Sequence, residues 1–369
     1  MAWFVGLMSG TSLDGVDGVL AEAQPGQLLQ ARGHVHRPFD ADLRSALLDL
    51  NTSGPDEIHR GALAANALMR SYAEVVAQLL QAAGLQPPQV QALGAHGQTV
   101  RHRPGEFDGT GYTVQLVNGA LLAEITGIDV VCDFRGRDVA AGGQGAPLVP
   151  AFHAACFGRP DQDVAVLNVG GIANLTLLPA QGPVGGFDCG PGNVLMDLWC
   201  QRHRGQSFDA DGAWAASGRV LQDLLAQCLR EPYFGQPPPK STGRDLFHAA
   251  WLSARAGEDA NPADVMATLA ELTAAAAVQA LKRHAPDAKR LLVCGGGAHN
   301  RHLMGRLTQL AGAGLDVQST AAAGVPPDQV EGLAFAWLAQ RFVSREPGNL
   351  PAVTGARGAR LLGALYPAG

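Results

Sequence analysis

Glycines and residues with hydroxyl or carboxylate side chains are concentrated in eight positions near the start of the chain, within GLMSGTSLDGVD. Gly10, Thr11 and Ser12 could present N–H and O–H donors to phosphate oxygens, with Asp14 or Asp17 near a Mg²⁺ ion. The same residues could also form only a tight turn, because glycines tolerate unusual backbone angles and Ser12 and Asp14 make local hydrogen bonds. The candidate phosphate loop comprises Gly10, Thr11, Ser12, Leu13, Asp14, Gly15, Val16 and Asp17.

Two later glycine turns offer similar chemistry. NVGGIANLT places Gly170 and Gly171 between apolar runs, and this second turn favours the phosphate-binding interpretation of the first. VCGGGAHN follows an apolar run and precedes a helical pattern, so it could be a helix-entry turn or a nucleotide contact. It also resembles the dinucleotide turn of an NAD-dependent oxidoreductase, with Asp316 about where a ribose-binding acid would lie. The candidate residues in this motif are Gly295, Gly296, Gly297 and Asn300, the last in place of the third glycine.

Several other polar residues have more than one explanation. His96 in AHGQT could be a buried histidine at a strand end, and Arg135 in DFRGRD could simply pair with Asp133. Asp188 in GFDCGPGN follows a short apolar strand, so we expect its carboxylate at the carboxyl end of that strand, where ligands bind in open α/β sheets. GQPPPKST superficially resembles a P-loop, but its prolines lack the N–H donors of a phosphate cradle, which excludes a Walker A site.

The hydrophobic pattern predicts the elements that hold these motifs in the first part of the chain. Two apolar runs flank the polar turn and predict a β-hairpin, and a helical pattern ends before Pro87 and Pro88, which cannot continue a helix. Together the elements form one layered α/β unit. The predicted strands are residues 3–8, 15–21, 34–38, 90–95 and 128–134, and the predicted helices are residues 58–83 and 118–126.

A similar order of elements begins again after the glycine-rich stretch GRDVAAGGQGAP, at residues 136–147. This stretch is the best candidate for a hinge or domain boundary. Strand, glycine turn and strand then recur at residues 163–179, and helices are predicted at residues 194–203 and 326–342. We therefore expect two related halves facing one another across a cleft, with a first domain at residues 1–140 and a second at residues 141–369.

Composition narrows the classes of function. The chain has 369 residues, of which 47% are hydrophobic and 16% charged, as in a well-packed two-domain α/β enzyme. A net charge of −6 without a basic run argues against a nucleic-acid partner. The six cysteines show no C-x-x-C spacing, and no export signal or membrane span is predicted. We expect a cytoplasmic protein with reduced thiols.

Several long motifs in the same order resemble the anhydro-N-acetylmuramic acid kinase family over almost the whole chain. They are GLMSGTSLDGVD, AHGQT, DFRGRDVAAGGQGAPLVP, NVGGIANLT, GFDCGPGN, PPPKSTGRDLF and VCGGGAHN. The resemblance implies two ribonuclease-H-like domains of the actin/Hsp70/sugar-kinase fold, with ATP in an interdomain active-site cleft. It also implies a homodimer, and makes the turn at Gly10 the first phosphate-binding loop.

The resemblance further implies an unusual reaction in peptidoglycan recycling. Water attacks C1 of 1,6-anhydro-N-acetylmuramic acid, and O6 takes the γ-phosphoryl group of ATP, with Mg²⁺ present, to give N-acetylmuramate 6-phosphate and ADP. Asp188 would be the general base. The motif positions suited to the sugar and its lactyl carboxylate are His96, Gln98, Thr99, Arg135 and Glu331.

Two departures from the family pattern stand beside these positions: Cys189 where threonine is expected, and Gly332 where alanine is commoner. Both are small changes that could tune the pocket. Two alternatives stay open, an NAD-dependent oxidoreductase using the turn at Gly295 and a non-enzymatic sugar sensor with the ATPase fold.

Overall fold

The chain forms two compact units in the computed structural model, which describes residues 2–10, 12–24, 26–244, 246–257 and 259–369. Unit 1 comprises Met1–Cys156 and Asp328–Gly369, and unit 2 comprises Phe157–Pro327. This division differs from the one expected at residue 140, because residues 141–156 and the C-terminal segment pack with the first half of the chain.

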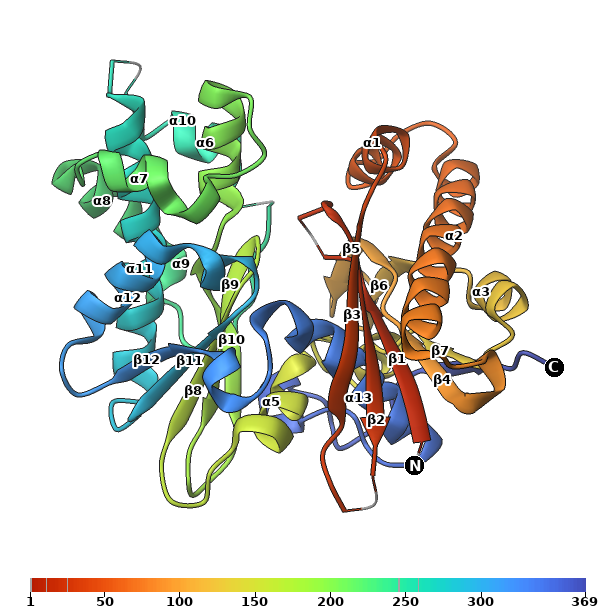
Figure 1. Ribbon diagram of the computed structural model, residues 1–369. Coiled ribbons are helices and arrows are strands. Elements are labelled where there is room, and N and C mark those ends of the chain that lie inside the picture. The colour runs from red at the N-terminus through yellow and green to blue at the C-terminus, as the bar shows by residue number, and fades with distance from the viewer. Residues whose placement is uncertain (1, 11, 25, 245, 258) are drawn as a thin grey trace. The chain divides into compact units, whose positions relative to one another are not determined.

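Unit 1 is built on a six-stranded sheet with the order β13-β7-β4-β1-β2-β3 (Figure 1). Its first three strands run antiparallel, β4 and β7 run parallel to β1, and β13 returns antiparallel to β7. A separate hairpin, β5 with β6, follows β4. The bounds are β1 (Ala2–Met8), β2 (Gly15–Ala23), β3 (Gln30–Pro38), β4 (Val90–Ala95), β5 (Gln98–Pro104), β6 (Gly111–Leu116), β7 (Val130–Cys132) and β13 (Ala364–Tyr366).

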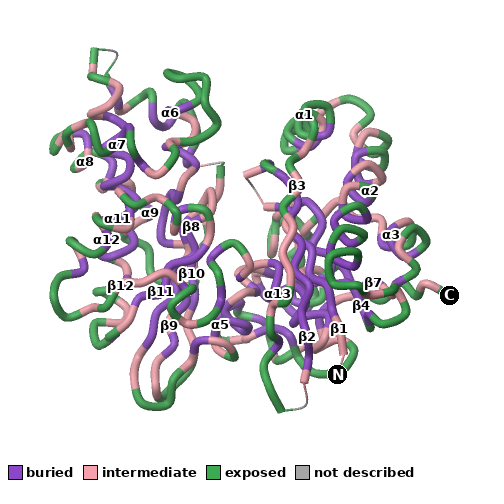
Figure 2. Tube along the Cα trace, viewed as in Figure 1, coloured by how far each residue is buried: buried purple, intermediate pink, exposed green. Residues whose placement is uncertain are grey.

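Helices cover both faces of this sheet. A side chain at Gly18 would overlap Val75 of α2, whereas a side chain at Gly6 or Gly94 would overlap the backbone of α13, so glycines let both helices approach the strands closely. Figure 2 shows β1 and β2 as largely buried and α1 as largely exposed. The helices are α1 (Ala41–Asp49), α2 (Glu57–Ala83), α3 (Gly119–Thr126), α4 (Gly136–Ala140), α5 (Val149–Phe157), α13 (Val330–Val343) and α14 (Pro351–Thr354), with short 3₁₀ turns at η1 (Pro87–Gln89) and η5 (Pro327–Gln329).

The same close packing explains why residue 332 is glycine, where alanine is commoner in the family pattern. Gly332 lies in α13 against β2, and a Cβ atom there would lie 2.6 Å from Cγ2 of Val19. Valine has little rotamer freedom to move aside, so glycine at 332 and valine at 19 fit one another. The structure thus explains Gly332 by helix–sheet packing.

Unit 2 repeats the strand arrangement of unit 1. Its five-stranded sheet has the order β10-β9-β8-β11-β12, in which β8, β9 and β10 are antiparallel and β11 and β12 run parallel to β8. Three antiparallel strands followed by parallel ones is the arrangement expected of a ribonuclease-H-like domain, and it confirms the two related halves. The strands are β8 (Val164–Val169), β9 (Ile172–Leu178), β10 (Gly185–Pro191), β11 (Arg290–Cys294) and β12 (Asp316–Ser319).

A long buried helix, α11 (Pro262–His284), packs on β9 and β10 and forms much of the core of unit 2. It is the one helix among the described residues that is long and apolar enough to cross a membrane, but 83% of its most apolar window is buried, as in a core helix. The other helices are α6 (Val194–Arg204), α7 (Ala213–Ser217), α8 (Gln222–Leu229), α9 (Pro232–Gly235), α10 (Ala249–Ser253) and α12 (Arg301–Ala311), with 3₁₀ turns η2 (Ala210–Gly212), η3 (Gly296–His299) and η4 (Thr320–Ala323).

The glycine-rich stretch at residues 136–147 is an internal part of unit 1 and not the boundary between the units. It begins with α4, and the side chain of Asp138 in that helix is fully buried. A Cβ atom at Gly143 would overlap the Asp138 carboxylate, so close packing accounts for a glycine that the sequence suggested was part of a hinge.

Candidate active site

The predicted first phosphate loop joins β1 to β2. Its backbone is closed by a hydrogen bond from Leu13 N to Gly10 O (3.3 Å), and Ser12 Oγ donates to Asp14 Oδ1 (2.6 Å). Leu13 and Val16 are buried among apolar side chains, so they anchor the loop and offer a ligand no side-chain contact. Thr11 lies outside the described residues.

The two carboxylates of this loop have different surroundings. Asp14 is exposed at the turn, whereas Asp17 Oδ1 lies 3.0 Å from both His34 Nε2 and His36 Nδ1. Burial alone would raise the pKa of Asp17, but the two histidine hydrogen bonds outweigh it and hold that pKa below its ordinary value. The same contact raises the pKa of His36. Asp17 is therefore engaged by β3, and Asp14 is the better placed of the two for a cation.

The segment after β4 lies directly against this loop. Ser9 Oγ donates to Gly97 O (3.1 Å), and Gln98 Nε2 donates to Gly10 O (3.1 Å). Gln98 is buried, and its Oε1 accepts no hydrogen bond within the described part of the chain. The parallel pairing of β1 with β4 brings the two segments together, because both follow the carboxyl ends of neighbouring strands.

His96 and Arg135 form a pair in unit 1. Arg135 donates from Nε (3.1 Å) and Nη2 (3.0 Å) to Nε2 of His96, and from Nη1 to the carbonyl oxygen of Gly145 (2.8 Å). Burial, and then the charge of Arg135, lower the pKa of His96 to about 3, so its ring is neutral near pH 7 and can accept these bonds. His96 is thus an acceptor that orients a guanidinium.

Thr99 belongs to a polar row that the sequence did not reveal. Gln115 Nε2 on β6 donates to the hydroxyls of Thr99 (3.1 Å) and Thr113 (2.7 Å), and His102 Nδ1 lies 3.0 Å from the Thr113 hydroxyl. A bulge between Thr99 and Arg101 turns His102 onto the face that carries Thr99. Elsewhere in unit 1, Glu331 is half-buried in the first turn of α13.

Asp188 lies in the middle of β10 and not at its carboxyl end as expected, because the strand continues through Pro191 in pairing with β9. The register shifts between Asp188 and Gly190, which makes Cys189 the bulged residue. Bulges often redirect a side chain beside an active site. The Cys189 thiol is buried and donates to Ala173 O (3.3 Å). A threonine hydroxyl could make the same hydrogen bond, so cysteine in place of the expected threonine keeps a donor at this position.

A segment after α9 holds Asp188 in place. Asp188 N donates to Lys240 O (3.2 Å), Thr242 N donates to Asp188 Oδ2 (3.0 Å), and the Tyr233 hydroxyl donates to Asp188 O (2.7 Å). Lys240 donates from Nζ to Tyr233 O (3.0 Å) and also interacts electrostatically with Asp188. Sequence reasoning excluded a P-loop in this segment but did not identify Lys240, Thr242 and Tyr233 as neighbours of the carboxylate.

The second predicted phosphate loop, between β8 and β9, is tied to the start of α6. Gly170 O accepts from Asn193 N (2.8 Å), and Gly171 O accepts from Gly192 N (2.9 Å) and Val194 N (3.1 Å). The Gly171 N–H shares a trans peptide with the Gly170 C=O and points opposite to it, so this N–H points away from Asn193. The turn can therefore present this N–H group to a ligand.

The triple glycine follows β11 and leads through η3 into α12. Asn300 Oδ1 caps α12 by accepting from Leu303 N (2.9 Å). Asp316 pairs with Arg290 at the opposite end of β11, five residues before Gly295 and so about 16 Å along the strand at ~3.3 Å per residue. Asp316 therefore lies at the amino-terminal end of the strands, whereas Gly295 follows the carboxyl end of β11. Asp316 cannot bind a ribose at Gly295, which removes the main support for a dinucleotide site.

Three glycines in these loops are not required by the fold. A Cβ atom at Gly10, Gly170 or Gly296 would meet no atom closer than 3.5 Å, and none of the three has a positive φ. By contrast, Gly15 and Gly297 have no room, since a Cβ atom would overlap Arg37 or Val169. A glycine that packing does not demand is typical of a loop whose backbone a ligand approaches closely.

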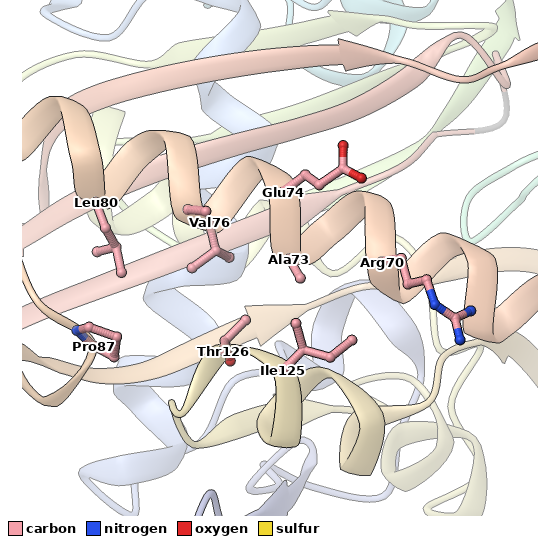
Figure 3. A pocket seen from close by; sticks show the side chains of 9 residues that line it. Arg70, Ala73, Glu74, Val76, Leu80, Pro87, Ile125 and Thr126 are labelled. Carbon is pink, nitrogen blue, oxygen red and sulfur yellow. The ribbon is translucent and has the colours of Figure 1, made fainter.

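Other possible sites within the described residues carry less chemistry. No group of three or more His, Cys, Asp or Glu side chains there could hold a metal ion. A hollow of about 560 Å³ lies between α2 and α3 in unit 1 (Figure 3). Its lining is mainly apolar and includes none of the predicted site residues.

Comparisons with known proteins match nearly the whole chain. The family model described as anhydro-N-acetylmuramic acid kinase matches residues 2–368. A protein of that name from Variovorax paradoxus is 60% identical to this chain, over 99% of this chain and 99% of its own length. One from Cupriavidus metallidurans is 58% identical, over 99% of this chain and 97% of its own length. Among solved structures, a ROK family glucokinase from Streptomyces griseus, in complex with glucose and AMPPNP, is similar with a TM-score of 0.40 and 12% identity, covering 92% of this chain and 100% of that one.

Proposed function

This chain belongs to the anhydro-N-acetylmuramic acid kinase family, and we propose that it opens and phosphorylates 1,6-anhydro-N-acetylmuramic acid with ATP during peptidoglycan recycling. Water adds to C1, the C1–O6 bond breaks, and O6 takes the γ-phosphoryl group, so the products are N-acetylmuramate 6-phosphate and ADP. Neither the NAD-dependent oxidoreductase nor the sugar sensor has support from the relatives.

The observation that carries the proposal is the setting of Asp188. Its backbone is fixed by Lys240 and Tyr233, and one carboxylate oxygen is fixed by the Thr242 N–H. A carboxylate held in this way can take the proton from the water that attacks C1, because general-base catalysis requires a positioned acceptor. The proton then passes to solvent as the product leaves.

The three glycines without a packing role support ATP binding by the loops that contain them. Gly10 in unit 1 and Gly170 in unit 2 would let phosphate oxygens approach backbone N–H groups, and the turn at Gly295 in unit 2 would contact the adenosine. Mg²⁺ would neutralise charge on the phosphates, and the exposed carboxylate of Asp14 would hold it. Unit 1 also carries the sugar residues, and unit 2 carries the base.

The sugar acid would be bound in unit 1. The guanidinium of Arg135, oriented by neutral His96, suits the lactyl carboxylate, because arginine recognises planar anions with several donors. Gln98 has a buried acceptor oxygen without a partner in the described residues, and Thr99 has a hydroxyl held by Gln115. These groups, with Glu331, would supply the remaining polar contacts.

Replacing Gly10 with alanine is expected to raise the KM for ATP by about tenfold to 100-fold, because a methyl group blocks close approach to a charged phosphate. The free energy of unfolding should change little, since the new Cβ atom has space. Gly18→Ala is the matched control in unit 1, because its Cβ atom would overlap Val75 and should lower stability without changing the KM for ATP. ATP titrations and urea denaturation of both variants test this, and an unchanged KM for G10A would remove Gly10 from the ATP site.

A coupled assay of ADP release tests the proposed function. With purified 1,6-anhydro-N-acetylmuramic acid and Mg-ATP, ADP should form at a rate that saturates with the sugar, and one 6-phosphate should form per ADP. An ADP release rate that does not depend on the sugar concentration, or the absence of any ADP release, would contradict the proposal. A homodimer and a cytoplasmic location stay predictions, for which light scattering and cell fractionation are the measurements.

A further inference from the structure

Asp138 in α4 is a carboxylate with no exposed surface that holds together segments more than 200 residues apart in sequence. Its Oδ1 accepts from Asn349 Nδ2 (2.6 Å) and Thr354 Oγ1 (2.8 Å), and its Oδ2 accepts from Gly145 N (2.8 Å). Hydrogen bonds to a buried charge are strong, and leaving a buried charge unsatisfied is costly. The carboxylate therefore fixes Gly145 relative to the C-terminal segment.

The residue that Asp138 fixes is also a partner of Arg135. The carbonyl oxygen of Gly145 accepts from Arg135 Nη1 (2.8 Å), while the other side of the guanidinium contacts His96. Asp138 thus acts on the guanidinium through a single residue, whose N–H it binds and whose C=O Arg135 binds. Movement of Gly145 would release the hydrogen bond that its carbonyl oxygen accepts from Arg135.

The C-terminal segment reinforces the same loop. Gln144 N donates to Thr354 O (2.7 Å), and Arg357 N donates to Ala141 O (2.9 Å). Asn349 is itself held, since its Oδ1 accepts from Arg360 N (2.7 Å). Residues 349–357 therefore form a strap over residues 141–145.

We propose that Asp138 is a positioning residue for the sugar site: with the strap it holds Gly145, and through Gly145 it presets the Arg135 guanidinium for the carboxylate of the sugar acid. This inference rests on the proposed function. A preset guanidinium loses less freedom on binding than a mobile one, so sugar affinity depends on the strap through Gly145 and Arg135.

Thr354→Val and Thr354→Ser test the proposal as a matched pair. Valine removes the hydroxyl that donates to Asp138, whereas serine keeps it. T354V should raise the KM for the sugar by about tenfold, with the KM for ATP unchanged, and T354S should restore the wild-type value. Thr126→Val in α3 is the control: like Thr354, whose hydroxyl also contacts Leu350 O, Thr126 donates to a backbone carbonyl four residues earlier, that of Leu122. This variant should leave both KM values unchanged.

Asp138→Asn is a second test, because donors face both oxygens of Asp138 and the amide NH₂ would face one of these donors whichever way the amide is turned. Its folded fraction is first measured by circular dichroism, and among folded protein the sugar KM should rise more than in T354V. If wild type turns over the sugar and T354V matches T354S in sugar KM, the positioning role is refuted. If wild type does not turn over the sugar, the proposed function fails instead.

Discussion

Asp188→Asn is expected to lower turnover by about 10²- to 10⁴-fold, the usual contribution of a general base, while ATP still binds. Asparagine keeps the shape of the side chain and can still accept a hydrogen bond from Thr242 N, but it cannot take a proton from water. Single-turnover kinetics would give the rate, and ATP titration followed by calorimetry would give the affinity.

Asp211→Asn is the control for this variant. Asp211 is also in unit 2 and has a cationic partner, Arg301, but no predicted part in the reaction. It should keep wild-type turnover. Near-normal turnover of D188N would show that Asp188 is not the base, and equal losses in both variants would point to a general effect on unit 2.

Arg135→Ala is expected to have the second-largest effect, a fall in kcat/KM for the sugar of about 10²-fold or more, because a buried charge pair is worth several kcal/mol when one partner is removed. Most of the loss should be in KM, since the guanidinium is proposed to bind a carboxylate that does not react. Arg135→Lys should recover little activity, because one ammonium cannot reach His96, Gly145 and a ligand together.

A sugar without the lactyl carboxylate separates binding of that group from other effects. Wild type should use 1,6-anhydro-N-acetylglucosamine far less well than the muramic acid, and R135A should use the two sugars about equally. Arg60→Ala, at an arginine of α2 that donates to Pro55 O, should leave the preference intact. A preference that persists in R135A would mean that Arg135 does not recognise the carboxylate.

Much of the fold was predictable because its signals are local. The hairpin around the first glycine turn, the helix that ends at Gly84 and the strand at residues 90–95 follow from apolar periodicity and turn residues, and the structure confirms them. The β5–β6 hairpin and α1 were not predicted, since β5 and β6 carry mixed polar residues without clean alternation. The return of the C-terminal segment as β13 depends on pairing with β7, which no local pattern reveals.

The sequence nominated candidate site residues, whose roles stay predictions, but it did not reveal their hydrogen-bond partners. The motifs identified Gly10, His96, Arg135 and Asp188, but nothing local shows that Asp17 is engaged by histidines of β3. Long-range packing also explains the glycine-rich stretch at residues 136–147. Its glycines suggested a hinge, but Gly143 and Gly145 pack against the buried carboxylate of Asp138. Glycine counts alone cannot separate close packing from flexibility.

The central claim is that ring opening and phosphoryl transfer are one coupled event, and labelling with ¹⁸O water tests it most directly. The enzyme, ATP, Mg²⁺ and anhydro-sugar react in ¹⁸O water, and the product is trapped by rapid reduction before its anomeric hydroxyl exchanges with solvent. Mass spectrometry should find the label on C1 and none in the phosphate ester, and a parallel reaction without ATP should leave the sugar unopened. Label in the phosphate, or ring opening at full rate without ATP, would contradict the account.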